Sequence, residues 1–171
     1  MDPRAESEFT EFMHGRWSSL VRLGYGLTGD QGLAEDLAQT ALANAYAAWP
    51  RVRRADDPDA YLRRILVNAH RGGFRKSRVR EQLTASPHDY AERASGDPAA
   101  LRPDRAAIIA ALLELPPRQR EVIVLRYWLD LTETQVAATL QCSVGNVKSQ
   151  TSRALAKLRD SAELAEWGGG R

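Results

Sequence analysis

The stretch LPPRQREVIVLRYWLDLTETQVAATLQCSVGNVKSQTSRALAKLR, residues 115–159, decides the fold of this 171-residue chain. Two consecutive prolines open a first helix, in which we expect four apolar residues to pack: Val122, Ile123, Leu125 and Tyr127. Thr132 with Gln135 has the spacing of a capping box for a short second helix. A turn at Gln141 and Cys142 then leads to Ser143, a typical N-cap residue, before a third helix. This order of helix, turn and helix predicts a helix-turn-helix unit.

The third helix of this stretch has two distinct faces when its residues are placed about 100° apart. The face expected to be buried carries Val144, Val147, Thr151, Ala154, Leu155 and Leu158. Small and polar residues form the other face: Gly145, Asn146, Ser149, Ser152, Arg153 and Ala156, with Lys148 on the flank. Small exposed residues let a helix enter a major groove closely, where Asn and Arg side chains pair with base edges. We therefore predict DNA binding by this face, although a helical hairpin with a polar outer side is the alternative interpretation.

Composition and pattern indicate an all-α protein. The chain is 43% hydrophobic and only 7% aromatic, a balance that favours helices and opposes disorder. Between Glu81 and Asp104 the helical periodicity ceases, and three prolines and a glycine occur. We predict two small helical domains, residues 1–80 and 105–171, joined by a flexible linker over residues 81–104.

The N-terminal domain is predicted to contain three helices. Apolar residues at helical spacing from Phe9 to Leu23 predict the first, ended by three nearby glycines: Gly24, Gly26 and Gly29. The second runs from about Leu33 to Trp49 and is stopped by Pro50. The third starts near Asp59, after Asp57 as an N-cap and Pro58 at the first helical position.

The second of these helices has an apolar stripe and a face of small and polar residues. The apolar stripe, expected in the core, consists of Leu42, Ala45, Tyr46 and Trp49. The small polar face consists of Asp36, Gln39, Ala43 and Ala47. Such a face lets a partner helix approach closely, although a solvated face is the alternative interpretation.

A net charge of +2 conceals a basic block. Residues 1–50 hold seven acidic and three basic residues, whereas residues 51–80 hold ten basic and three acidic residues. The third helix has a polar stripe on one side and an apolar stripe on the other. The polar stripe consists of Arg64, Asn68, Arg71, Arg75 and Arg78, and it is flanked by Val67 and Phe74. The apolar stripe consists of Leu62, Ile65, Leu66 and Ala69. Arginines on one face without matching acids favour a polyanion partner over a merely solvated face. Gly72 and Gly73 predict that the helix ends or bends there.

Several function classes are disfavoured. Cys142 is the only cysteine, so it forms no intrachain disulfide, and we expect it to be a small buried residue in its turn. The three histidines are scattered, no Gly-rich phosphate loop follows a strand, and no metal-ligand spacing occurs, so we predict no catalytic residues, metal or cofactor. The N-terminus lacks a signal-peptide pattern and no segment is long and apolar enough to span a bilayer, so a cytoplasmic protein without membrane contact is expected.

Taken in order, these segments resemble an extracytoplasmic-function (ECF) sigma factor, a member of the sigma-70 family of bacterial RNA polymerase. AEDLAQTALANAYAAW resembles the polymerase-binding helix of that family, and DDPDAYLRRILVNAHRGGFRKSR resembles its promoter-melting and minus-ten segment. The helix-turn-helix stretch resembles its minus-thirty-five reader. The order and spacing of all three around a Pro-rich linker make the resemblance specific.

The resemblance implies partners and residue roles. It implies binding of core RNA polymerase through Asp36, Gln39 and Ala43, binding of promoter DNA through both domains, and an anti-sigma factor as a possible regulator. It also implies capture of a flipped minus-ten base by the loop from Arg51 to Asp57. The sequence departs from the family pattern at three positions: Thr40 replaces an acid, Tyr61 replaces a tryptophan, and Gly72 lies where the family often has an aspartate.

Two other classes of protein are alternatives to a sigma factor. A response-regulator or quorum-type activator also ends in a helix-turn-helix with a similar PPRQREV opening, but its N-terminal domain would contain strands. An enzyme is disfavoured for the reasons above. For a sigma factor, we expect weak duplex binding by the free chain, because two tethered modules gain promoter geometry only when polymerase fixes their separation.

Overall fold

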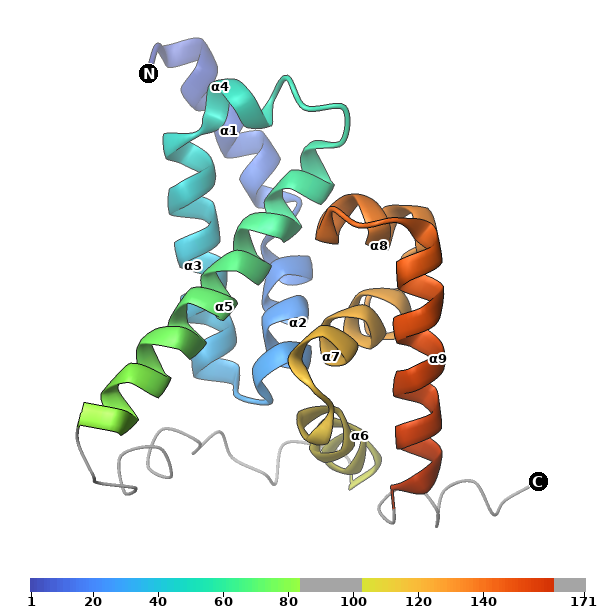
Figure 1. Cartoon of the computed structure of the whole chain (residues 1–171). Helices are drawn as coiled ribbons and strands as arrows, with labels where there is room; N and C mark the ends of the chain where they lie inside the picture. The colour runs from blue at the N-terminus through green and yellow to red at the C-terminus, as the bar shows by residue number, and fades with distance from the viewer. Residues whose placement is uncertain (84–102, 162–171) are drawn as a thin grey trace.

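The computed structural model describes residues 1–83 and 103–161, with side chains for residues 1–73 and 104–161. Every regular element in the described ranges is helical, which confirms the predicted all-α class. Figure 1 shows the N-terminal helices on one side of the molecule and the C-terminal helices on the other. The predicted linker lies almost entirely outside the described residues.

The N-terminal domain contains five helices. They are α1 (Pro3–His14), α2 (Trp17–Thr28), α3 (Gln31–Ala47), α4 (Trp49–Val52) and α5 (Pro58–Leu83). Aspartates start three of them, because the carboxylates of Asp2, Asp30 and Asp57 accept hydrogen bonds from backbone N–H groups in the first turns. The single first helix that we predicted is wrong, since the chain breaks at Gly15 and Arg16 between α1 and α2. Pro50 likewise lies at the start of α4 rather than ending a helix.

Two of the glycines expected to end the first helix lie inside α2. A Cβ atom on Gly24 would lie 2.9 Å from Cα of Ala34, so the glycine allows α3 to approach α2 closely. Gly29 alone has the predicted role, since it caps α2 in the left-handed conformation with φ of 68°. The glycines in this segment therefore serve packing as much as helix termination.

The C-terminal domain has the predicted helix-turn-helix. Its elements are α6 (Pro103–Glu114), α7 (Pro117–Ile123), a π-helical turn η2 (Val124–Trp128), α8 (Glu133–Leu140) and α9 (Val144–Asp160). Thr132 and Gln135 form the predicted capping box of α8, and Ser143 caps α9. Between them Gln141 adopts the left-handed conformation, with φ of 53°. The local turn chemistry is thus confirmed.

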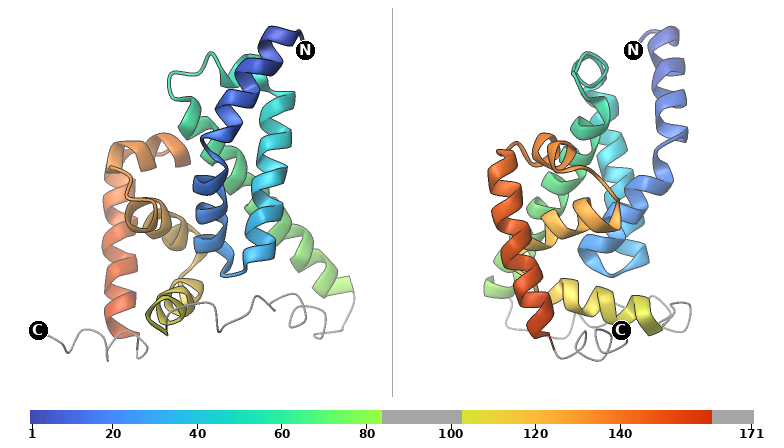
Figure 2. Two further views of the ribbon diagram at one scale, coloured as in Figure 1. Left: turned by 180° about the vertical axis from the view of Figure 1, so that it is seen from behind. Right: turned by 90° about the vertical axis from the view of Figure 1, so that its right-hand side faces the viewer.

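The two domains pack directly against each other, which the sequence did not predict. α8 lies beside the first half of α5, and α6 and η2 lie beside α2, as the two views in Figure 2 also show. Buried side chains from both domains form one hydrophobic cluster. Gly26 is part of this contact, because its Cβ position would lie 2.7 Å from Cγ1 of Val124 and 3.1 Å from Cδ1 of Trp128.

Several residues lie in other environments than predicted. α5 continues through Gly72 and Gly73 to Leu83, and Val67 on its flank is buried. Tyr46 and Tyr127, both expected to pack in the core, are 42% and 53% exposed. Cys142 is half-buried rather than buried. In the described ranges no helix combines the length and apolarity that a membrane crossing requires.

Candidate nucleic-acid and polymerase interfaces

α9 presents the predicted polar face to solvent. Val147 and Ala154 are fully buried against the domain, and Thr151 bonds back to the carbonyl of Val147. The α9 residues predicted to bind DNA are all exposed: Asn146, Lys148, Ser149, Ser152 and Arg153. Lys148 approaches Glu133 at 3.8 Å, a distance at which an exposed ion pair contributes little. The helix therefore offers a free, small-residue surface of the kind that fits a major groove.

α3 exposes the face that we predicted to bind polymerase. Four alanines on its inner side are completely buried against neighbouring helices: Ala34, Ala38, Ala41 and Ala45. Their small size lets α2 and α5 pack closely on this side, which fixes the orientation of the other face. That face carries Asp36, Gln39 and Ala43 together with Thr40 and Ala47, and all five are exposed. Within the described residues Asp36 has no ion-pair partner.

The arginine stripe of α5 contacts the C-terminal domain. Arg71 donates two hydrogen bonds to the carboxylate of Glu121, of 2.8 Å from Nε and 2.6 Å from Nη2. Arg64 donates to the backbone carbonyls of Ala138, at 2.8 Å, and Thr139, at 3.3 Å. Asn68 remains exposed between them. The structure thus brings Arg64, Asn68 and Arg71 onto one side of the helix, while the side chains of Arg75 and Arg78 lie outside the described residues.

Glu121 is a buried carboxylate that the sequence analysis missed. Its side chain is only 2% exposed, whereas that of Arg71 is 29% exposed. The hydrogen bond to Glu121 raises the pKa of Arg71, so the guanidinium is charged and paired with the carboxylate. The only available signal was an acid inside the apolar run that follows Arg120. A helical wheel reads such an acid as a solvent-facing residue.

Two further sets of polar contacts join the domains. Arg120 donates to the carbonyls of Leu112 and Leu115 within its own domain and, at 3.3 Å, to Leu27 at the end of α2. Trp128 and Arg22 bond reciprocally: the indole N–H donates to the Arg22 carbonyl at 2.9 Å, and the Arg22 guanidinium donates to the Trp128 carbonyl at 3.0 Å. Burial lowers the pKa of Arg120, and the nearby Glu121 carboxylate opposes this effect.

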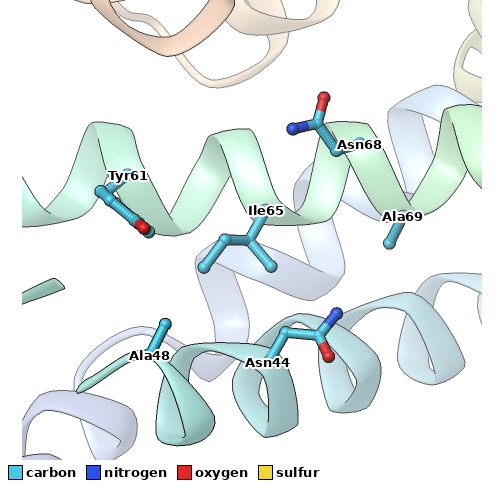
Figure 3. Close-up of a pocket in the computed structure, with 6 residues that line it drawn as sticks. All are labelled: Asn44, Ala48, Tyr61, Ile65, Asn68 and Ala69. Carbon is cyan, nitrogen blue, oxygen red and sulfur yellow. The ribbon is translucent and has the colours of Figure 1, made fainter. Parts of the chain in front are cut away.

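A hollow lies between α3 and α5. Its volume is about 380 Å³, and its lining residues are Asn44, Ala48, Tyr61, Ile65, Asn68 and Ala69. In Figure 3 the side chains of Tyr61 and Ile65 point toward α3, whereas the amide of Asn68 points away from it. The hollow therefore combines an aromatic ring, apolar walls and amides at its rim. In the part of the chain that the structure describes, no group of three His, Cys, Asp or Glu side chains is arranged to hold a metal.

Comparison with known proteins identifies the family. The Sigma-70 region 2 family matches residues 17–80, and the Sigma-70, region 4 family matches residues 105–158. The "RNA polymerase sigma-E factor" of Streptomyces antibioticus is 38% identical over 159 residues, which cover 93% of this chain and 87% of that protein. This chain belongs to the sigma-70 family of RNA polymerase sigma factors. The resemblance deduced from the three sequence segments is confirmed.

Further relatives place this sigma factor in the ECF branch. The "ECF RNA polymerase sigma factor EcfG" of Rhodopseudomonas palustris is 30% identical over 141 residues, which cover 82% of this chain and 77% of that protein. Among solved structures, the sigma factor RpoE in complex with the anti-sigma factor NepR, from Bartonella quintana, superposes with a TM-score of 0.71 at 25% identity. That match covers 90% of this chain and 95% of the other. The response-regulator alternative is not favoured, because a sigma region, not a receiver, matches the N-terminal half.

His70 of this sigma factor is expected to make the folded chain less stable in acid. Burial and the nearby Arg120 and Arg71 lower its pKa below the ordinary value, although Glu121 opposes them, and its Nδ1 has no hydrogen-bond partner. The unfolded chain takes up a proton near the ordinary pKa of about 6.5, before the folded chain does, so folding stability should fall as the pH falls through that value. Urea unfolding at about pH 7.5 and pH 5.5 measures the loss. His70→Gln should reduce this loss, and an equal loss in both proteins would contradict the assignment.

Proposed function

We propose that this chain directs core RNA polymerase to specific promoters and assists promoter melting. The observation that carries the proposal is that one chain presents two free faces: the small-residue face of α9 and the Asp36 face of α3. The names of the relatives support polymerase as the partner. The boundaries we propose are a polymerase and minus-ten domain in residues 1–80, a linker in residues 81–104, and a minus-thirty-five domain in residues 105–171.

The function proposed is one of binding, without a reaction catalysed by this chain. Core polymerase and promoter DNA are in the bacterial cytoplasm, so we assign the chain to that compartment. We also expect no cofactor. An anti-sigma factor is a further proposed partner, because the similar RpoE was solved with one bound. The contact with polymerase is assigned to Asp36, Gln39 and Ala43 on the exposed side of α3.

DNA contacts are assigned to both domains. In the minus-thirty-five domain, three residues would form hydrogen bonds to base edges: Asn146, Ser149 and Arg153. Lys148 and Ser152 would contact the phosphate backbone along the groove. On α5, the polar stripe would hold the phosphate backbone near the melted region, through Arg64, Asn68, Arg71 and Arg75. The stripe can do so only when its arginines are released from the C-terminal domain.

The hollow between α3 and α5 is a candidate place for an unpaired base. Aromatic rings stack on bases of any sequence, and amide groups pair with their edges, so Tyr61 and Asn44 supply suitable chemistry there. Of the predicted loop from Arg51 to Asp57, where we expected base capture, Arg51 and Val52 belong to α4, and residues 53–57 join α4 to α5. The hollow is lined by Ala48, just before α4, and by Tyr61 in the first turn of α5. We therefore extend the proposed base site from the loop to the hollow.

Transcription in vitro tests the proposed function. Core polymerase is incubated with genomic DNA fragments, with and without the purified chain, and the start sites of the transcripts are mapped. New start sites that share two upstream elements and that depend on the chain are the expected result. If the chain adds no start site, or if it binds duplex DNA tightly and specifically without polymerase, the proposal is wrong.

Arg153→Ala should change base preference in the upstream promoter element. Arg153 and Ser149 lie one turn apart on the exposed face of α9, and losing a base-reading pair costs about 1–3 kcal/mol at a single position. Transcription from a randomised promoter library measures the preference. Arg159→Ala is the matched control, because it removes an exposed arginine from the last turn of the same helix. An unchanged preference in Arg153→Ala would contradict the base-reading role.

A further inference from the structure

We infer that this sigma factor inhibits itself: its helix-turn-helix domain occupies the arginine stripe of α5 with oxygen atoms that take the place of DNA phosphates. The inference deepens the proposed function, since it depends on α5 being a DNA-binding helix. It adds that the free chain has a closed state, in which this helix is blocked, and that the domains separate before the helix binds DNA.

The groups on the stripe resemble phosphate oxygens in that they accept hydrogen bonds from guanidinium groups. Glu121 offers Arg71 two carboxylate oxygens, in the paired arrangement that arginine also forms with phosphate. Arg64 is held by two carbonyls near the C-terminal end of α8, those of Ala138 and Thr139. The C-terminal end of a helix carries a partial negative charge, so this end attracts a guanidinium as an anion would.

Occupation by the C-terminal domain and occupation by DNA exclude each other. Glu121 is 2% exposed, so no phosphate can approach the paired side of Arg71 unless α7 moves away. Arg63, next along α5, is also engaged: its Nε donates to the hydroxyl of Thr139 at 3.0 Å. Two separate elements of the C-terminal domain, α7 and α8, therefore bind arginines that lie about two turns apart on α5.

The polar part of the contact favours reversible opening. A buried ion pair contributes little net stability, because desolvation of both charges offsets their attraction. The closed state also buries two polar atoms without partners, Nδ1 of His70 and the hydroxyl of Tyr25, and opening would return both to water. The groove face of α9 stays exposed in the closed state, so the block acts on α5 alone.

Two substitutions should open the interface by different means. Glu121→Gln removes the negative charge that holds Arg71 and keeps the shape of the side chain. Gly26→Leu places a bulky side chain between the domains. The three atoms nearest the Cβ position of Gly26 belong to Val124 and Trp128 of the C-terminal domain, so the new side chain pushes against that domain. Glu8→Gln is the matched control, since it removes a carboxylate that pairs with Arg53 inside the N-terminal domain.

The test measures opening and DNA binding separately on the full chain. Small-angle X-ray scattering gives the radius of gyration, and fluorescence anisotropy gives the affinity for a labelled, mixed-sequence single-stranded DNA. We expect Glu121→Gln and Gly26→Leu to expand the protein and to raise this affinity about tenfold, because apparent affinity scales with the fraction of the competent state. Glu8→Gln should match the wild type in both measurements. Adding Arg71→Ala to Gly26→Leu should remove most of the gain.

Each other outcome overturns the inference. A wild-type chain that is already expanded in solution has no closed state to inhibit it. Expanded variants with unchanged affinity mean that the C-terminal domain does not block the stripe, and variants that stay compact mean that these contacts do not hold the domains together. Helical content by circular dichroism confirms that each variant is folded. Promoter-dependent transcription by the wild-type chain with core polymerase tests the proposed function on its own.

Discussion

Asp36→Arg is expected to weaken binding of core polymerase at least thirtyfold while the domain stays folded. Asp36 is exposed on α3 and has no ion-pair partner within the described residues, so its replacement leaves no buried charge. At the proposed interface the reversal places like charges together and should cost about 2–5 kcal/mol, which is at least a thirtyfold loss of affinity. A titration of labelled chain with core polymerase measures the loss. Asp36→Asn, which removes the charge without reversing it, should lose less.

Glu11→Arg provides the control for Asp36→Arg. It makes the same change of charge at an exposed position of α1, a helix to which no polymerase contact is assigned. The control protein should bind polymerase as the wild type does. If Asp36→Arg also binds polymerase with normal affinity, α3 is not the polymerase-binding helix. The polymerase contacts proposed for Gln39 and Ala43 are then wrong as well.

Helix starts and the faces of exposed helices could be predicted from sequence because their causes are local. The Thr132–Gln135 capping box and the Ser143 cap depend on residues three positions apart, and both have the expected geometry. The exposed polar faces of α3 and α9 are also as predicted, because small and polar residues share one side of each helix. Such signals need no knowledge of which distant segment lies nearby.

The contact between the domains could not be predicted in this way. A helical wheel separates polar from apolar residues but does not say whether a polar stripe meets water, DNA or another part of the chain. Arg71 and Glu121 are 50 positions apart, and each taken alone resembles a surface residue. Gly26 shows the same limit, since its small size is explained only by Val124 and Trp128 of the other domain.

The two mispredicted tyrosines have a related cause. Tyr46 falls on the apolar side of its helix, but its ring packs edge-on against Phe9 at the rim of the domain and its hydroxyl approaches Glu6. Tyr127 lies in the π-helical turn, where the extra residue per turn changes which side chains face inward. A wheel drawn with regular α-helical spacing cannot place a residue in such a turn.

Gly24→Val is expected to destabilise the N-terminal domain by about 3 kcal/mol. Its Cβ would lie 2.9 Å from Cα and 3.0 Å from the carbonyl oxygen of Ala34, and both are backbone atoms that cannot rotate away. α2 and α3 would have to separate, which would open the part of the core around Ala38. Because small domains have only about 5–15 kcal/mol of stability, this is a large fraction of the total. Urea unfolding followed by circular dichroism measures the loss.

Gly72→Val isolates the packing effect from the change in helix propensity. Both glycines lie inside helices, but a Cβ on Gly72 meets no atom within 4 Å. Valine is a slightly better helix residue than glycine, so this variant should stay within about 0.5 kcal/mol of the wild type. A loss in Gly72→Val as large as that in Gly24→Val would show that helix propensity, rather than the approach of α3 to α2, governs these positions. The expected difference between the two variants measures how much the domain depends on the close contact at Ala34.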